Sequence, residues 1–217
     1  MALLIGMAKV GILGSGSVGQ ALASGFVKSG YEAMIGTRDK SKLADWLKKT
    51  KASAGSFAEA AAFGELLVLC CKGEAVEDVI KLAGKENFSG KIVIDVTNPL
   101  LFEEGKGPRL FTGYPDSLGA RVQRLLPNSK VVKAFNSVTA AYMANPKLQE
   151  GVPDLFIAGN DAGAKKKVGS IASGWGWTVH DLGGIEQAYL LEALAMIWIR
   201  YGFLNNHWTH AFKLLKK

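Results

Sequence analysis

The sequence predicts an α/β fold in which a doubly wound, mostly parallel sheet is followed by a helical C-terminal region. Three observations lead to this prediction. Short apolar runs alternate with stretches of helical spacing, the connections between them are short, and a glycine-rich turn joins the first apolar run to the first helical stretch. A helix between two strands is the usual crossover that makes them parallel.

Strands are predicted where apolar residues run together between turn residues. Such runs fit strands that are buried on both faces, as in a parallel sheet. In chain order they cover residues 9–14, 31–36, a short strand near 52, and then 66–71, 91–96, 130–135, 154–158 and 177–180.

Helices are predicted where apolar residues recur every three or four positions. They cover residues 18–28, 40–49, a short helix from 56, and then 74–83, 117–126, 162–173 and the region from 185 to the end. We expect residues 1–184 to form a dinucleotide-binding domain of Rossmann type. Residues 185–217 would pack on it or on a dimer partner.

The stretch 187–204 is apolar nearly all round, so it needs cover on more than one side. Glu192 and Arg200 lie within it, which favours a buried helix over a membrane span. We therefore predict a homodimer in which this region packs against its twin, and no membrane partner.

Composition restricts the remaining partners. The net charge is +7, but the lysines are scattered and no cluster is interleaved with aromatic residues that could stack on bases, so no nucleic-acid partner is expected.

The two cysteines, Cys70 and Cys71, are adjacent, and neighbours on a strand point to opposite sides. We expect reduced thiols in a cytoplasmic protein. The loop 101–116 is long for a compact domain and is a candidate lid or partner contact.

A glycine-rich motif follows the first predicted strand and opens the first predicted helix. It reads Gly14-Ser15-Gly16-Ser17-Val18-Gly19. In a dinucleotide-binding turn the first glycine allows the tight bend, the second admits a pyrophosphate, and the third lets the helix pack close to the sheet. The free N–H groups at the helix start would face the phosphates.

The turn after the second predicted strand decides which dinucleotide is expected. NAD-binding proteins commonly carry an acid about 20 residues after the glycine motif, where it binds the ribose hydroxyls. Here the turn reads Gly36-Thr37-Arg38. A hydroxyl and a guanidinium suit a 2′-phosphate, and Lys42 could add a second cation. Asp39 is expected to cap the next helix. The turn therefore predicts NADP(H).

Several stretches together resemble the F420-dependent NADP oxidoreductase family, the bacterial dinucleotide-binding enzymes grouped with it, and the N-terminal reductase domain of STEAP metalloreductases. They are ILGSGSVGQALA, IGTRD, VIDVTNP, VVKAFNS, LFIAGND and FKLL. The resemblance spans nearly all of the chain from Lys9. The sequence has no transmembrane part, so a full STEAP-type metalloreductase is not expected.

The resemblance implies a set of cofactor-binding residues. Gly14 to Gly19 would form the cofactor loop, with Ser15 to Val18 on the pyrophosphate, and Thr37, Arg38 and Lys42 would hold the 2′-phosphate. Cys71 and Lys72 would lie beside the ribose. Asn98, Pro99, Ala134, Asn136 and Ala140 would border the nicotinamide and a second redox partner, which is F420 in the family or a flavin (FMN or FAD) in relatives. Archaeal F420 enzymes carry a histidine where this sequence has Asn136, so the acceptor stays open.

No convincing general acid–base pair is evident, and no catalytic residue is assigned. His180 is expected to be structural, and His207 and His210 to share the surface of a helix without forming a metal site. Asn136 is the polar residue most suspected near the reacting rings. The first hypothesis is hydride transfer between NADPH and a flavin or deazaflavin. The alternatives are an imine or carbonyl reductase of the pyrroline-carboxylate reductase type, and an NADPH-binding sensor without turnover.

Overall fold

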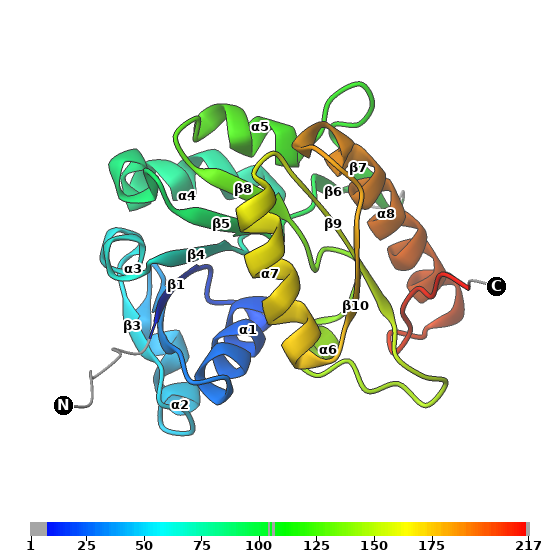
Figure 1. Ribbon diagram of the computed structural model, residues 1–217. Helices are drawn as coiled ribbons and strands as arrows, with labels where there is room; N and C mark the ends of the chain where they lie inside the picture. Colours follow the sequence, from blue (N-terminus) through cyan, green and yellow to red (C-terminus); the bar gives the residue numbers. More distant parts are fainter. Residues whose placement is uncertain (1–7, 104, 106, 216–217) are drawn as a thin grey trace.

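An eight-stranded sheet with helices on both faces forms the centre of the molecule (Figure 1). The computed structural model describes residues 8–103, 105 and 107–215. The strand order is β10-β9-β8-β5-β4-β1-β2-β3. The strands are β1 (Lys9–Leu13), β2 (Glu32–Gly36), β3 (Ser53–Gly55), β4 (Leu66–Leu69), β5 (Ile92–Asp95), β8 (Lys130–Lys133), β9 (Asp154–Gly159) and β10 (Thr178–Asp181).

The sheet is parallel except at one junction, where β8 and β9 pair antiparallel. β10 runs parallel to β9, so these last two strands oppose the other six. The prediction of a doubly wound, mostly parallel sheet is therefore confirmed. The apolar pattern could not predict that β9 runs antiparallel to β8. Alternate residues of a strand are buried in the same way whichever direction the strand runs.

Two apolar cores, one on each face, hold the helices against the sheet. One contains Phe26 of α1 (Ser17–Lys28) and Val168 of α7 (Ala162–Trp175), and the other contains Ile80 of α4 (Val76–Ala83) and Val122 of α5 (Leu118–Leu125). β4 shows why both faces are apolar: Val68 enters the first core, and Leu67 and Leu69 enter the second. The helices are α1 (Ser17–Lys28), α2 (Ala44–Leu47), α3 (Phe57–Phe63), α4 (Val76–Ala83), α5 (Leu118–Leu125), α6 (Ala140–Met143), α7 (Ala162–Trp175) and α8 (Ala188–Asn205). The 3₁₀ turns are η1 (Lys40–Leu43), η2 (Gly73–Ala75), η3 (Lys85–Phe88) and η4 (Ile185–Gln187).

The long loop contains structure that was not predicted. β6 (Leu100–Glu103) and β7 (Gly107–Leu110) form an antiparallel hairpin within residues 100–110. Gly105 has a φ of +76°, which suits a tight reversal. Whether this hairpin acts as a lid or a partner contact stays a prediction.

The C-terminal region differs from the expected continuous helix. α8 packs beside α5 and β9 (Figure 1) and ends at Asn205, because Asn206 adopts a left-handed conformation with φ +45°. The prediction that His207 and His210 lie on a helix is therefore wrong. The following segment runs back to the start of β9, where Asp154 N–H donates to the carbonyl of Phe212 at 2.9 Å. Among the described residues no helix has the length and hydropathy to cross a bilayer.

Candidate functional site

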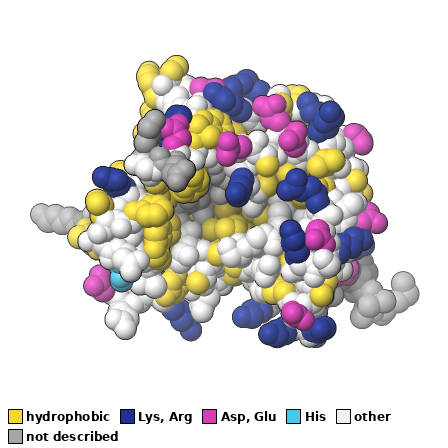
Figure 2. Space-filling model, turned by 180° about the vertical axis from the view of Figure 1, so that it is seen from behind, with side chains coloured by type: hydrophobic (Ala, Val, Ile, Leu, Met, Phe, Trp, Pro, Cys, Tyr) yellow, Lys and Arg dark blue, Asp and Glu magenta, His cyan; other side chains and the backbone are white. Residues whose placement is uncertain are grey.

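The topology places a switch point of the sheet at the carboxyl ends of β1 and β4. These two strands are neighbours in the sheet although β2 and β3 lie between them in the chain, so the strand order reverses there. In open α/β sheets such a reversal leaves a binding crevice outside the carboxyl ends. The glycine loop, residues 14–19, begins directly after β1. From behind, the molecule is hollowed near its centre, with hydrophobic side chains gathered on the flank where α8 lies (Figure 2).

The three glycines of the loop have different surroundings. Gly14 has a φ of +144°, and a Cβ there would lie 2.8 Å from the carbonyl oxygen of Cys70. A Cβ on Gly19 would lie 2.0 Å from the carbonyl oxygen of Gly14. A Cβ on Gly16 would meet nothing within 4 Å. Gly14 and Gly19 are therefore needed for the turn and its packing, whereas the backbone at Gly16 is open to a ligand.

The start of α1 is free to receive an anion. Gly16 is the N-cap and makes no side-chain capping bond, and no acidic residue lies in the first turn. The first N–H groups of a helix have no intrahelical partner, and the dipole is positive at this end. The residues present therefore fit a dinucleotide pyrophosphate at this loop.

The turn after β2 contacts the glycine loop through its threonine. Thr37 Oγ1 donates to Ser15 Oγ at 3.0 Å, although the two residues are 22 positions apart. A side chain at Gly36 would instead meet Phe57 and Ala60 of α3, each at 3.1 Å. The residue of this turn that faces the glycine loop is therefore Thr37 and not Gly36.

The two cations expected beside Thr37 are both exposed, Arg38 directly after it and Lys42 in η1. Lys42 Nζ lies 4.0 Å from Asp39 Oδ2, and both groups are well exposed. Asp39 caps η1 as expected, with its carboxylate accepting from Ser41 N–H at 3.0 Å. The bonds from the Ser41 side chain and backbone, with Lys42, lower the pKa of Asp39.

A second group of predicted residues meets at the ends of β5 and β8. Asn98 Nδ2 donates to the carbonyl of Asn136 at 2.7 Å, and Asn136 Nδ2 donates to Asn98 Oδ1 at 3.0 Å. Asn136 Nδ2 also reaches the carbonyl of Leu191 on α8 at 2.8 Å. We call Asn98 and Asn136 the amide pair. Phe135, between β8 and this pair, has a φ of +59°, a conformation that a bulky residue rarely adopts.

The remaining predicted residues lie around the same strand ends. Cys71 and Lys72 follow β4, the thiol partly exposed and the lysine exposed. Burial, and then the charge of Asp95, raises the pKa of Cys71 to about 12, so this thiol is neutral at physiological pH. Pro99 and Ala134 are buried, and Ala140 is partly exposed at the start of α6. The neighbouring thiol of Cys70 donates to the carbonyls of Leu13 and Gly14, and burial raises its pKa.

Sequence reasoning missed three charged residues beneath the amide pair. Lys133 of β8 is fully buried between Asp95 of β5 and Glu192 of α8. Burial lowers the pKa of Lys133, but the two carboxylates outweigh it and the net shift is upward. The lysine stands in KAFN, inside a predicted buried strand, and that position was the signal that could have identified it.

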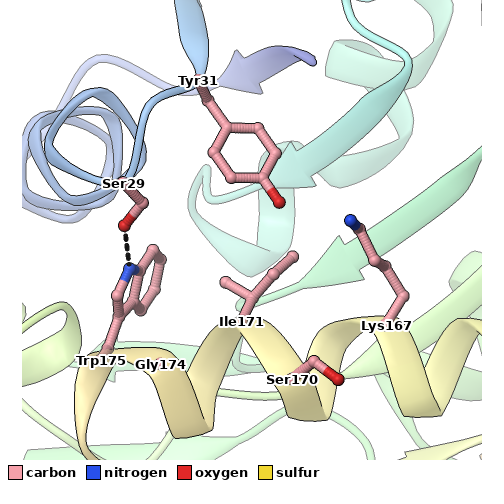
Figure 3. Close-up of a pocket in the computed structure, with 7 residues that line it drawn as sticks. All are labelled: Ser29, Tyr31, Lys167, Ser170, Ile171, Gly174 and Trp175. Atoms are coloured by element: carbon pink, nitrogen blue, oxygen red, sulfur yellow. Dashed lines mark hydrogen bonds between the residues drawn. The ribbon is translucent and has the colours of Figure 1, made fainter. Parts of the chain in front are cut away.

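A separate cavity lies far from the glycine loop in the fold. It is lined by Ser29, Tyr31, Lys167, Ser170, Ile171, Gly174 and Trp175, and has a volume of about 320 Å³ (Figure 3). Tyr31 precedes β2, whereas Thr37 follows it, so the cavity is at the opposite end of the strand from the predicted cofactor turn. Trp175 Nε1 donates to Ser29 Oγ at 2.9 Å across it. None of the predicted site residues lines this cavity.

Comparison with known proteins identifies the family of this chain. Residues 9–99 match the model of the family described as NADP oxidoreductase, coenzyme F420-dependent. These residues contain the glycine loop, the Thr37–Arg38 turn and Asn98.

Two curated relatives and one solved structure cover most of the chain. The F420-dependent NADP reductase of Methanocaldococcus jannaschii is 33% identical over 206 residues, which span 88% of this chain and 91% of the relative. Metalloreductase STEAP3 of Rattus norvegicus is 31% identical over 189 residues, 87% of this chain and only 36% of that protein. A crystal structure of a candidate F420-dependent NADP-reductase from Arthrobacter sp. FB24 superposes with a TM-score of 0.92 at 36% identity, covering 97% of this chain and all of that one.

The expected resemblance is thus confirmed over nearly the full length of an archaeal reductase and of the Arthrobacter structure. The chain belongs to the F420-dependent NADP oxidoreductase family, a family of NADP-dependent oxidoreductases.

Proposed function

We propose that this protein transfers a hydride between NADPH and a planar flavin or deazaflavin acceptor. The observation that carries the proposal is the pairing of an open glycine loop with the Thr37–Arg38 turn, where a hydroxyl faces Ser15 and a guanidinium is exposed beside it. NADPH, when bound, supplies the hydride from its nicotinamide ring. The chain's own residues bind and orient the two rings and limit access of water.

The adenosine half of the cofactor would lie on the β2 side of the crevice. Ser15 to Val18 would hold the pyrophosphate, and Thr37, Arg38 and Lys42 would hold the 2′-phosphate. Arginine binds phosphate oxygens through a planar fork, and lysine through a point charge. The nicotinamide half would lie towards β5 and β8, bordered by Cys71, Asn98 and Asn136.

The polar groups at that second end favour ring-to-ring transfer over reduction of an imine or carbonyl. An imine or carbonyl reductase needs a proton donor at the reacting atom. Among the described residues there, the amide pair is internally bonded, Cys71 has a raised pKa, and Lys133 is buried among acceptors. Transfer between two stacked rings depends mainly on proximity and orientation, and the balancing proton comes from solvent.

The proposal includes a homodimer built on α8. Large hydrophobic side chains recur along one stripe of this helix: Leu190 is 42% exposed, Ile197 60%, Tyr201 49% and Leu204 68%. A stripe of this kind on a helix normally packs against another surface. A second copy of the chain would cover it.

Acceptor specificity is the decisive test. NADPH oxidation should be followed with F420, FMN, FAD, a ferric chelate and a cyclic imine. We expect turnover with F420 or a flavin. Turnover with the imine alone would contradict the proposal and favour the reductase alternative. Tight NADPH binding without turnover of any acceptor would favour the sensor alternative.

A further inference from the structure

Three charged side chains are buried together where β5, β8 and α8 meet. Lys133 Nζ lies 3.1 Å from Asp95 Oδ2 and 3.0 Å from Glu192 Oε1, and it donates to the carbonyl of Thr97 at 2.5 Å. The side chains of Lys133 and Asp95 are 0% exposed and that of Glu192 is 1% exposed. We call Lys133, Asp95 and Glu192 the ion cluster.

Each carboxylate of the ion cluster has backbone partners as well. Glu192 accepts from the N–H groups of Leu118 at 3.0 Å and Gly119 at 2.9 Å, which are the first residues of α5. Asp95 accepts from Thr97 N–H at 2.9 Å and Thr97 Oγ1 at 2.6 Å. The cluster is thus well supplied with partners. Buried ion pairs seldom stabilise a fold more than apolar residues would, so a cluster like this one invites a role other than stability.

The ion cluster and the amide pair join the same three segments. Asp95 and Asn98 come from the end of β5, Lys133 and Asn136 from the end of β8, and Glu192 from α8, next to the Leu191 carbonyl that accepts from Asn136. In each of the two strand segments, the amide-pair residue follows the ion-cluster residue by three positions: Asn98 follows Asp95, and Asn136 follows Lys133. The ion cluster and the amide pair therefore form two adjacent layers. An ionic layer therefore lies directly behind the polar groups proposed to border the nicotinamide.

The backbone between the ion cluster and the amide pair is strained at Phe135, and the two layers can hold it in place. Phe135 lies between Lys133 and Asn136, is fully buried and has a φ of +59°. A bulky residue in this region persists only where its surroundings hold it. The ionic bonds on one side and the amide bonds on the other fix both ends of this strained step.

We propose that Lys133 is a positioning residue. Through Asp95 and Glu192 it fixes α8 against the ends of β5 and β8, and so it sets the amide pair at the position from which the acceptor ring is aligned. This inference rests on the proposed function. Lys133 is no proton donor, because its three N–H groups face Asp95, Glu192 and the Thr97 carbonyl. The expected effect is on the alignment of the rings and not on NADPH affinity, which depends mainly on the distant Thr37–Arg38 turn.

The test uses Glu192→Gln and Asp95→Asn, which preserve shape and remove one charge each. Glu192 also holds the start of α5 and Asp95 does not, so an effect common to both variants reports on Lys133. Ile80→Val, a truncation in the core on α4, is the control for lost stability. Thermal unfolding, NADPH Kd, and kcat and KM for the acceptor should be measured for each protein.

We expect both charge variants to keep NADPH Kd within about twofold while kcat falls by about tenfold or more, since small misplacements of reacting groups are costly. If kcat fell in all three variants in proportion to the loss of folded protein, the inference would be overturned. An unchanged kcat in the two charge variants would also overturn it. If the wild-type protein turned over no acceptor, the proposed function would fail separately. The emission spectrum of bound NADPH would then decide: a shift in both charge variants but not in Ile80→Val supports positioning, and no shift refutes it.

Discussion

At the scale of residues, the proposed choice of NADPH rests on a few individual side chains. Thr37 donates to Ser15 of the glycine loop, and the next residue in the chain, Arg38, is exposed. Asp39, the nearest acid, has its carboxylate bonded to Ser41 at the start of η1. This carboxylate therefore serves as the cap of the turn, accepting from its backbone N–H.

Arg38→Ala should weaken NADPH binding by about tenfold to a hundredfold and change NADH binding little. The substitution removes hydrogen bonds to a charged group, which contribute about 1.5–3 kcal/mol. Titration of the two cofactors by fluorescence measures the difference. Lys48→Ala, which removes an exposed cation paired with Asp45, is the control and should leave both affinities unchanged. Equal losses for NADPH and NADH would contradict the assignment of this turn.

Two glycines of one motif should respond differently to the same change. Gly19→Ala places a Cβ 2.0 Å from the Gly14 carbonyl oxygen, so it should destabilise the fold by about 1–3 kcal/mol. Gly16→Ala meets no protein atom within 4 Å and should unfold like the wild type, yet bind NADPH more weakly. Thermal unfolding and NADPH titration separate the two effects. A Gly16→Ala protein with normal affinity would argue against a phosphate at this loop.

At the scale of elements, the segment after α8 is attached to the sheet at Asp154, through its backbone N–H and its carboxylate. Asp154, at the start of β9, accepts from Leu214 N–H at 2.5 Å and from Lys213 Nζ at 3.2 Å, and His180 Nε2 lies 3.3 Å from it. Burial raises the pKa of Asp154, but these partners outweigh it and the net shift is downward. The carboxylate form is therefore favoured by folding.

This attachment should be lost in acid. A lowered native pKa means that the contribution of Asp154 is complete above its ordinary pKa, about 3.9, and disappears as the pH falls through the lowered value. Trp208 packs on Trp198 at 5.5 Å and reports release of the segment by its fluorescence. Asp154→Asn should show the released signal already at neutral pH. Trp208→Phe is the control, and a pH response that survives in it would come from another part of the molecule.

The helices differ in how much local sequence supports them. Ser56 and Glu59 form a capping box at the start of α3, so this short helix carries its own start signal. α6 has four residues and no side-chain cap, and it was not predicted. The β6–β7 hairpin likewise lies in a stretch rich in glycine and proline, which obscured its two short strands.

At the scale of the whole molecule, the hydrophobic stripe of α8 is exposed on the surface. Ile197→Glu should convert the proposed homodimer to a monomer, because a carboxylate would have to be buried in the interface. Sedimentation velocity measures the change. Leu82→Glu on α4 is the matched control: Leu82 is 54% exposed and lies on another helix. A wild-type protein that sediments as a monomer would refute the dimer.

The succession of strands and helices along the chain could be derived from the sequence alone, and so could the class of cofactor. Apolar runs, helical spacing and the glycine motif are local patterns, and each follows from contacts between residues close in the chain. The adenosine side of the proposed site was predictable for the same reason, since the glycine loop and the turn after β2 are each continuous stretches.

Only the tertiary structure decided the features that bring distant residues together. The antiparallel entry of β9, the return of the C-terminal segment to Asp154 and the ion cluster of Asp95, Lys133 and Glu192 all join segments far apart in the chain. A single lysine in an apolar run gives no sign of its partners, because burial of a charge depends on carboxylates that other elements contribute. The sequence by itself determined the cofactor class that this protein is expected to hold, and the packing of α8 against the sheet decided what lies behind the proposed nicotinamide end.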